Sequence, residues 1–389
     1  MHKIAVITGT RAEYGILKNI IRKIDEDEQL ELQLIVTGTH LSEEYGYTAR
    51  EIEEDGFAIT EKIQMIMQSN TGASIVKSMG LLMINLSQTM DRIKPDILVI
   101  LGDRYEILAA AATAMEMNIP IAHLCGGEVT EGAIDEQIRH SITKMAHLHF
   151  TASEQYAQNV IKMGEERWRV YNVGHPSIEN IKIMEFMTKR EISIDIGVDI
   201  DHETLLVTFH PTTLELKDLD WQIDNLTKAL KELNLKTVIT YPNADEGGKL
   251  IIGKLQKLKS ESNKVYLFDN LGVKKYLSIM RLCGAVVGNS SSALVEAPYL
   301  KVPVVNIGNR QKGRLKASNI LNSSYCEPDI IDKVKIALSD EFRTDCGNTI
   351  SLYGEGNTST KIVQILKTID NNEKLMKKKL IWDFDDKAR

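Results

Sequence analysis

The chain lacks the features that mark several large protein classes. Its four cysteines lie far apart and form no CxxC pair, which argues against a disulfide framework and a structural zinc site. The 47 lysine and arginine residues are interspersed among 54 acidic residues, so no nucleic-acid partner is expected. No apolar run approaches the ~20 residues of a membrane span, and the run from Ile4 to Ile7 is too short for a signal peptide. These absences predict a cytoplasmic protein that stays off membranes.

The pattern of apolar residues along the chain predicts an α/β architecture. A length of 389 residues with 43% hydrophobic residues favours two packed domains, with a cleft between them. Short apolar runs alternate with segments of helical periodicity, as expected for buried parallel strands joined by helices. The strand-like runs lie at 3–7, 32–38, 96–102 and 120–124 in the first half, and at 204–210, 237–242, 264–269, 284–289 and 302–308 in the second.

Three other segments bear on the organisation of the chain. A helix is predicted from about 220 to 233, and a last helix from about 359 to 370. The stretch 176–203 lacks strong apolar periodicity, so we expect the chain to cross there from the first domain to the second.

Two motifs of the first half follow predicted strands, where open α/β sheets bind their ligands. In TGTRAEYG (8–15), Arg11 is suited to a phosphate near a helix N-terminus; a helix cap with a surface arginine is the alternative. In LGDRYE (101–106), Asp103 and Arg104 are either functional or a structural ion pair. Neither motif is a GxGxxG or Walker loop, so no dinucleotide or ATP cofactor is expected.

An acidic loop follows the predicted strand 120–124. Its carboxylates repel one another, and repulsion with partial burial raises carboxyl pKa values into the range for proton transfer. The alternative is a solvated helix in which Asp135 and Arg139 form an i,i+4 pair. The candidate residues of this loop are Glu128, Glu131, Asp135, Arg139 and His140.

Polar motifs also follow the predicted strands of the second half. Serines that begin a helix leave its free amide groups available to a phosphate, although they are helix caps in most proteins. A lone histidine or an Asx turn is equally ordinary. The candidates here are His210, Asn243, Ser290, Ser291, Glu296 and Arg310. No cluster has convincing metal-ligand spacing, so no bound metal is predicted.

Taken in order, these motifs resemble one known family. TGTRAEYG, LGDRYE, GGEVTEGAIDEQIRH, FHPTT, YPNADEG, GNSSSALVEAP and NIGNRQKGR resemble the hydrolysing UDP-N-acetylglucosamine 2-epimerases of sialic acid biosynthesis. The resemblance runs from about residue 3 to residue 315, with a weaker echo at 351–357.

The resemblance implies a glycosyltransferase-B-like fold of two Rossmann-type domains with an interdomain cleft. The first domain would span 1–178, with a C-terminal helix at about 359–389 packing back on it. The second, UDP-binding domain would span 179–358. A homodimer or homotetramer is also implied.

The resemblance also implies roles for residues. Asp103 and Asp135 would handle protons at the sugar, and Arg139 and His140 would position the acidic loop. The residues that would hold UDP are Arg11, His210, Asn243, Ser290, Ser291, Glu296 and Arg310, with Arg104 nearby. The catalytic candidates are therefore Asp103, Asp135, Glu128, Glu131 and His210.

One residue departs from the family pattern. Many relatives have a glutamate where this chain has Cys125, and a thiol with a pKa near 8.5 replaces a carboxylic acid poorly. Either Glu128 or Glu131 supplies the acid, or the acid is less essential, or the substrate differs.

The expected reaction is elimination of UDP from UDP-N-acetylglucosamine to a glycal, followed by hydration to N-acetylmannosamine. An alternative within the family is a hydrolysing 2-epimerase of UDP-N,N'-diacetylbacillosamine in legionaminic acid synthesis. A glycosyltransferase with the same architecture, or a non-catalytic sugar-nucleotide sensor, is the more distant alternative.

Overall fold

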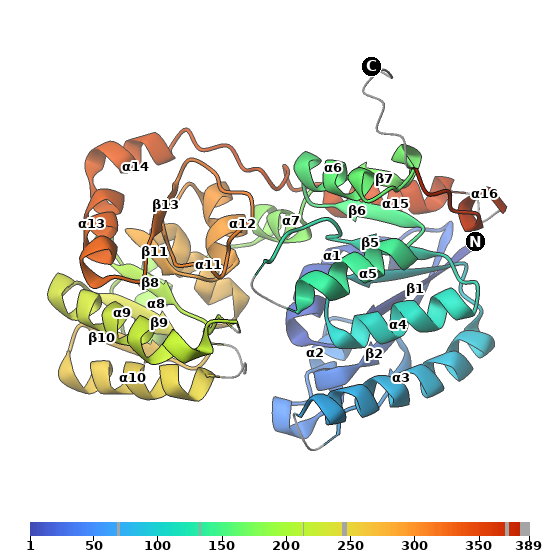
Figure 1. The fold of residues 1–389 in the computed structure, drawn as a ribbon, viewed down its shortest axis with the longest axis horizontal. Coiled ribbons are helices and arrows are strands. Elements are labelled where there is room, and N and C mark those ends of the chain that lie inside the picture. Colours follow the sequence, from blue (N-terminus) through green and yellow to red (C-terminus); the bar gives the residue numbers. More distant parts are fainter. Residues whose placement is uncertain (68–70, 132–133, 213, 243–246, 370–372, 382–389) are drawn as a thin grey trace. The chain divides into compact units, whose positions relative to one another are not determined.

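The computed structural model describes residues 1–67, 71–131, 134–212, 214–242, 247–369 and 373–381. Two units emerge from the contacts within the chain. Unit 1 comprises Met1–Glu128, Ile134–Asn180 and Tyr353–Arg389, and unit 2 comprises Val129–Ala133 and Ile181–Leu352. Each unit is described by itself below (Figure 1).

Unit 1 is built on a seven-stranded parallel sheet with the order β3-β2-β1-β4-β5-β6-β7. The strands are β1 His2–Thr8, β2 Leu30–Thr37, β3 Ile59–Ile63, β4 Ile97–Leu101, β5 Ile121–Leu124, β6 Leu148–Thr151 and β7 Val170–Asn172. Strand β1 lies at the centre, where its apolar run from Ile4 to Ile7 is completely buried. Such a run is typical of a strand covered on both faces.

Helices cover both faces of this sheet because right-handed crossovers to opposite sides of β1 lie on opposite faces. The helices of unit 1 are α1 Arg11–Asp25, α2 Ala49–Glu54, α3 Gly72–Ile93, α4 Tyr105–Glu116, α5 Asp135–Met145, α6 Glu154–Lys162, α15 Thr358–Thr368 and α16 Glu373–Met376. Helix α3 packs on α4, α4 packs on α5, and α15 packs on α1. The last helix-like segment of the sequence therefore belongs to unit 1, next to the first helix of the chain.

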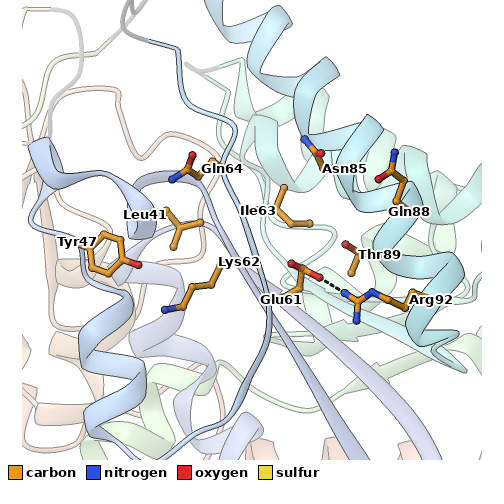
Figure 2. A pocket seen from close by; sticks show the side chains of 10 residues that line it. All are labelled: Leu41, Tyr47, Glu61, Lys62, Ile63, Gln64, Asn85, Gln88, Thr89 and Arg92. Atoms are coloured by element: carbon orange, nitrogen blue, oxygen red, sulfur yellow. Dashed lines mark hydrogen bonds and ion pairs between the residues drawn. The ribbon is translucent and has the colours of Figure 1, made fainter.

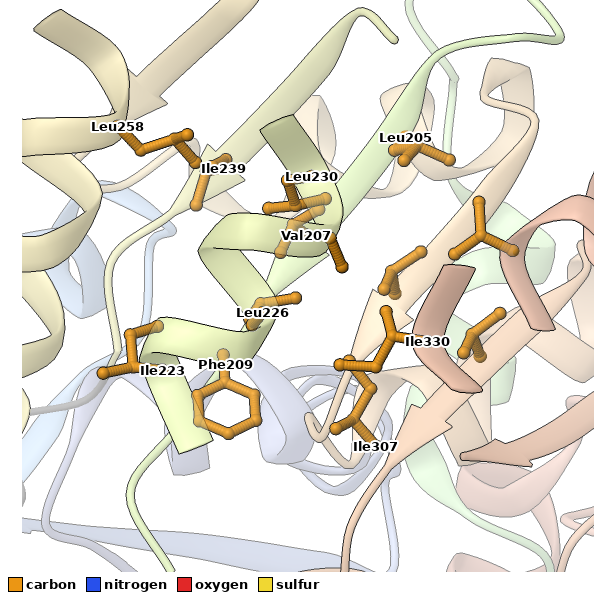
Figure 3. Close-up of a cluster of buried hydrophobic side chains, with 14 of the residues drawn as sticks. Leu205, Val207, Phe209, Ile223, Leu226, Leu230, Ile239, Leu258, Ile307 and Ile330 are labelled. Carbon is orange, nitrogen blue, oxygen red and sulfur yellow. The ribbon is translucent and has the colours of Figure 1, made fainter. Parts of the chain in front are cut away.

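Unit 2 repeats the architecture with six parallel strands in the order β10-β9-β8-β11-β12-β13. They are β8 Leu205–Thr208, β9 Thr237–Thr240, β10 Val265–Phe268, β11 Ala285–Gly288, β12 Val304–Ile307 and β13 Ile320–Ser323. Figure 3 shows one side of the core, in which Val207 of β8 faces Leu226 and Leu230 of helix α9 (Leu219–Leu233). Each such leucine contributes about 1.5–3 kcal/mol through burial.

The helices of unit 2 complete the two-sided covering. They are α8 Lys189–Ile196, α9 Leu219–Leu233, α10 Gly248–Glu261, α11 Gly272–Leu282, α12 Ser292–Leu300, α13 Glu327–Leu338 and α14 Asp340–Cys346. The stretch 176–203 contains α7 Pro176–Ile183 and α8, and the boundary between the units falls within α7. Weak periodicity there therefore reflects two short helices rather than an irregular linker.

The two sheets have equivalent switch points. Connections leave β1 and β4 in opposite directions along the sheet of unit 1, and β8 and β11 do the same in unit 2. The loops after such neighbouring strands diverge, which leaves a crevice at their carboxyl ends where α/β proteins bind ligands. These two strand pairs therefore mark where functional side chains are expected.

Candidate active site

At the switch point of unit 1, the loops after β1 and β4 are in direct contact. A Cβ atom on Gly9 would lie 2.7 Å from Cγ of Glu106, so the close approach requires glycine. Glu106 is completely buried and accepts a hydrogen bond from Nε of Arg104 at 2.7 Å. The motifs that contain Gly9 and Arg104 thus form one polar cluster.

Arg11 is the first residue of α1, which begins with a capping box formed by Thr10 and Glu13. Its side chain is 53% exposed, and its Nε lies 2.9 Å from Oε1 of Glu51. The structure therefore shows an exposed ion pair at this position, and a phosphate role for Arg11 requires that the arginine exchange or share this partner.

Arg139 gathers the acids of unit 1. Its side chain is 2% exposed and forms an ion pair with Asp103, which follows β4. Its Nη1 also donates to the carbonyl oxygen of Glu128 at 3.0 Å and to Oε2 of Glu136 at 3.1 Å. The expected repulsion within the acidic loop is thus offset by a buried cation, which also fixes Asp103 beside the loop.

Asp135 is the first residue of α5 and is partly exposed. His140 lies one turn further along α5, where its Nε2 is 3.0 Å from Oε1 of Glu136. Glu136 therefore bridges Arg139 and His140, and these polar contacts hold the start of α5.

Cys125, directly after β5, has an unusual backbone conformation. Its φ angle is +62°, a left-handed value that residues other than glycine rarely adopt, and its side chain is 6% exposed. Cys125, Glu128 and His175 each have a side-chain atom that could bind a metal ion, and these three atoms all lie within 4.8 Å of one another. Sequence spacing did not reveal this group because His175 follows β7, two strands along the sheet.

Glu131 has its ion-pair partner within unit 2. Residues Val129–Ala133 cluster with unit 2, where Oε2 of Glu131 lies 3.2 Å from Nζ of Lys312. The expected grouping of Glu131 with Glu128 and Asp135 stays a prediction, since Glu131 belongs to unit 2 and those two acids belong to unit 1. Gly313 packs against Val129, since a Cβ atom there would lie 2.4 Å from Cγ1 of the valine.

At the switch point of unit 2, Asn289 connects the loops after β8, β11 and β12. Its side chain accepts from the backbone N–H of His210 at 2.7 Å and donates to the His210 carbonyl at 2.8 Å. Its own carbonyl accepts from Nη1 of Arg310 at 3.0 Å and from the Gln311 side chain at 2.8 Å. Asn289 is completely buried, and the motif analysis had passed over it in favour of the following serines.

His210 is held as a neutral imidazole. Burial, together with the positive charge of Arg310, lowers the pKa of His210 to about 3. At neutral pH the ring is therefore suited to hydrogen bonding rather than to donating a proton as imidazolium.

The serines after β11 leave donors available at the start of α12. Ser291 is the N-cap residue, but its hydroxyl makes no capping bond, and the Ser290 hydroxyl accepts a long bond of 3.4 Å from the Ser292 N–H. Glu296 lies within α12, and its charge adds to the burial that raises the pKa of Tyr276 to about 12. Asn243 lies outside the described residues.

A hollow of about 750 Å³ lies elsewhere on unit 1, beside the edge strand β3 and helix α3 (Figure 2). Its lining is mostly polar and includes the ion pair between Glu61 and Arg92. None of the predicted site residues contributes to it.

Two parallel-sheet units with polar side chains at both switch points place the protein in the class of α/β proteins that bind ligands at the carboxyl ends of their strands. Within this class, the family model described as UDP-N-acetylglucosamine 2-epimerase matches residues 22–367. The chain therefore belongs to this family of enzymes.

Relatives and solved structures agree with this assignment. The GDP/UDP-N,N'-diacetylbacillosamine 2-epimerase (hydrolyzing) of Campylobacter jejuni is 45% identical over 84% of this chain and 85% of its own. The UDP-N,N'-diacetylbacillosamine 2-epimerase (hydrolyzing) of Legionella pneumophila is 32% identical over 97% and 99%. A UDP-GlcNAc 2-epimerase from Neisseria meningitidis, solved with UDP-GlcNAc, has a TM-score of 0.79 at 19% identity, covering 94% of this chain and 99% of its own. The last comparison confirms the glycosyltransferase-B-like fold of two Rossmann-type domains.

Among the described residues, no helix combines the length and apolarity needed to span a bilayer.

Proposed function

We propose that the protein is a hydrolysing 2-epimerase whose substrate is UDP-N,N'-diacetylbacillosamine. The observation that carries the proposal is the 45% identity to a hydrolysing enzyme named for this sugar, with a second such enzyme aligned over nearly the whole chain. The motifs alone favoured UDP-N-acetylglucosamine as the substrate. The names of these two relatives favour UDP-N,N'-diacetylbacillosamine instead. Cys125, where the family resemblance implies a glutamate, is consistent with a different sugar.

The reaction begins with removal of the C2 proton and departure of UDP with the electrons of the C1–O bond, which leaves a C1–C2 double bond. Water then adds a hydroxyl group at C1 and a proton at C2 on the opposite face, which gives the free 2-epimer. Because a C2 proton without an adjacent carbonyl is weakly acidic, most of the acceleration must come from stabilising the departing diphosphate.

In unit 1, Asp103 is assigned the proton at C2, and Asp135 is assigned the proton that returns. The contact between Arg139 and Asp103 supports this role, since a buried guanidinium fixes the direction of the carboxylate. Glu128, whose carbonyl Arg139 also holds, is the further acid on the same loop.

In unit 2, the start of α12 and Arg310 are assigned to the diphosphate. Free amide groups and the Ser290 and Ser291 hydroxyls donate to anions there, and the macrodipole of the helix favours negative charge. His210, as a neutral ring beside Arg310, adds a hydrogen bond without adding charge. Glu296 and Asn243 are assigned to the nucleoside by family resemblance.

We also propose that two copies of the chain pair through α3. Three apolar side chains of this helix are exposed, namely Val76 at 67%, Leu81 at 39% and Ile84 at 60%. Lys77, Ile84 and Asp91 are spaced seven residues apart and therefore lie along one line of the helix.

The charges on this line are self-complementary. A two-fold axis at Ile84 would align two α3 helices antiparallel, with Lys77 of one copy opposite Asp91 of the other. Within the part of the chain that the structure describes, neither Lys77 nor Asp91 has an ion-pair partner. A homodimer is therefore the proposed assembly, and the cytoplasm, where nucleotide sugars are made, is the proposed compartment.

The substrate is tested by incubating purified protein with UDP-N,N'-diacetylbacillosamine, its GDP-linked counterpart and UDP-N-acetylglucosamine. Nucleoside diphosphate release gives kcat/KM, and NMR of the released sugar identifies the configuration at C2. We expect at least about a hundredfold preference for the diacetylated sugar, equivalent to about 3 kcal/mol. A preference for UDP-N-acetylglucosamine would contradict the proposal and support a hydrolysing UDP-N-acetylglucosamine 2-epimerase. Release of diphosphate only with an added acceptor would indicate a transferase.

A further inference from the structure

Arg104 is held from one side only. Its Nε donates to Oε1 of Glu106 at 2.7 Å, and its guanidinium carbon lies 5.7 Å from the centre of the Tyr105 ring. No hydrogen bond is made by its two terminal nitrogens within the described parts of the chain. The side chain is 43% exposed. Arg104 is the N-cap residue of α4 and lies in the loop after β4. The two terminal nitrogens of Arg104 are therefore donors that a ligand at the switch point of unit 1 can use.

Two buried carboxyl groups lie within 4.0 Å of Nε of this arginine. Glu106 is completely buried, and Glu13 is 7% exposed. Oε2 of Glu13 accepts from the backbone N–H groups of Gly9 at 2.8 Å and Thr10 at 3.2 Å. Its Oε1 lies 4.0 Å from Nε of Arg104. Gly9 lies against the Glu106 side chain, since a Cβ atom on Gly9 would be 2.7 Å from Cγ of Glu106.

The charge count of this group decides what it can bind. Two carboxylates and one guanidinium carry a net charge of −1, which repels a phosphate, whereas one added proton makes the group neutral and leaves the arginine attractive. Oε1 of Glu13 and Oε2 of Glu106 are both buried and, among the described residues, accept no hydrogen bond. Either of these two oxygens can carry a proton. One proton is expected, because two buried carboxylates beside a single cation are costly to ionise together.

We propose that Glu13 and Glu106 are positioning residues that hold one proton between them, and so allow Arg104 to bind a phosphate of the nucleotide sugar through its terminal nitrogens. The identity of the ligand rests on the proposed function, whereas the shared proton does not. The arrangement would use the capping box of α1 as part of an anion site.

The titration behaviour agrees with this geometry. Burial, and then repulsion by Glu106, raise the pKa of Glu13 to about 8, against smaller opposing effects of Arg104 and the two N–H groups. His40 is a further titratable group at this turn, and its Nε2 lies 3.1 Å from the Thr8 hydroxyl. Burial lowers the pKa of His40 to about 4, so it stays neutral over the range of interest.

The test is calorimetric titration of the full-length protein with UDP between pH 7 and pH 9, in buffers of different ionisation enthalpy. The wild-type protein should lose about tenfold in UDP affinity across this range and should take up a proton on binding at pH 9. Glu13→Gln keeps an oxygen for the two N–H groups and replaces the proton with an amide donor. It should bind UDP at pH 9 as tightly as at pH 7, with no proton uptake attributable to this site.

Three further variants separate the explanations. Glu53→Gln makes the same change in net charge at an exposed ion pair of unit 1 and should retain the wild-type pH dependence. Glu106→Gln should also abolish the pH dependence, because one carboxylate then remains for Arg104. Arg104→Ala should weaken UDP binding at pH 7 by about a hundredfold; unchanged affinity would overturn the phosphate role.

A readout without ligand tests the proton itself. The infrared C=O stretch of a protonated carboxyl group should be present in the wild-type protein at pH 7 and absent in Glu13→Gln. If that band is present but UDP does not bind, the proposed function fails and the shared proton stands. If Glu13→Gln retains both the band and the wild-type pH dependence, the shared proton is refuted.

Discussion

Arg139 and Asp103 form an ion pair between α5 and the loop after β4, although they are 36 residues apart in sequence. The arginine is almost fully buried and also contacts Glu128 and Glu136. One cation therefore contacts the carboxylates of Asp103 and Glu136 and the main chain of Glu128.

Replacing Arg139 should destabilise the protein strongly. Arg139→Met leaves Asp103 and Glu136 without their buried cation, and we expect the free energy of unfolding to fall by about 3–5 kcal/mol in urea titrations. The control is Arg92→Met, because Arg92 pairs with Glu61 on the surface with a side chain that is 58% exposed. Its loss should be below about 1 kcal/mol. Equal losses in the two variants would contradict the central role of Arg139.

Asp103→Asn tests the proton transfer. The amide keeps the shape of the side chain but cannot accept the C2 proton, so diphosphate release should slow by about a hundredfold or more. Binding of UDP, followed by calorimetry, should stay within a few-fold of the wild type. Asp332→Asn, at a 61% exposed position of unit 2, should leave the rate unchanged. Release at the native rate by Asp103→Asn would remove Asp103 from the mechanism.

The proposed α3 interface predicts a charge-swap rescue. Lys77→Asp should place like charges opposite each other and shift the protein from dimer to monomer in analytical ultracentrifugation, and Asp91→Lys should do the same. The double variant Lys77→Asp/Asp91→Lys restores the complementary pairs, so the dimer should return. Ile84→Glu should give a monomer on its own. A protein that stays dimeric in all four variants pairs through another surface.

Glu165 is a buried acid that is expected to make a pH-dependent contribution to the free energy of unfolding. Burial of Glu165 is outweighed by hydrogen bonds from His149 and Lys144, which lower its pKa to about 2. Since the pKa is depressed in the folded state, the stabilisation is present above the ordinary value near 4.5 and is lost as the pH falls toward 2.

Glu165→Gln should therefore lower the free energy of unfolding by roughly 3 kcal/mol at pH 7. The difference from the wild type should shrink between pH 4.5 and pH 2.5 in urea titrations. Glu261→Gln, whose carboxyl group pairs with Lys231 on the surface, serves as the control. A difference that stays constant with pH would show that Glu165 acts through packing rather than charge.

The hydrophobic pattern predicted the central strands of both sheets but missed some of the edges. β3, β7 and β13 were not predicted, and each lies at an edge of its sheet. The ITEKI sequence of β3 alternates buried or partly buried positions with exposed ones, since one side of an edge strand meets solvent. A run without continuous apolar residues does not stand out from a loop.

The candidate site was predicted in its residue types and only partly in its contacts. Arg139 was expected near the acidic loop, but its partner Asp103 comes from another strand. Glu131 was grouped with its sequence neighbours, yet it pairs with Lys312. Asn289 and Glu106 were passed over, although both are completely buried at the two switch points.

The sequence by itself determined the α/β class, the central strands and the motifs that identify the family, because apolar periodicity and motif order are local properties of the chain. Tertiary structure alone decided which charges meet. Strand order places β1 beside β4 and β8 beside β11, and only that adjacency brings Glu13 to Glu106 and Asn289 to His210. Electrostatic and hydrogen-bond energies depend on distances in space, which residue spacing along the chain does not encode.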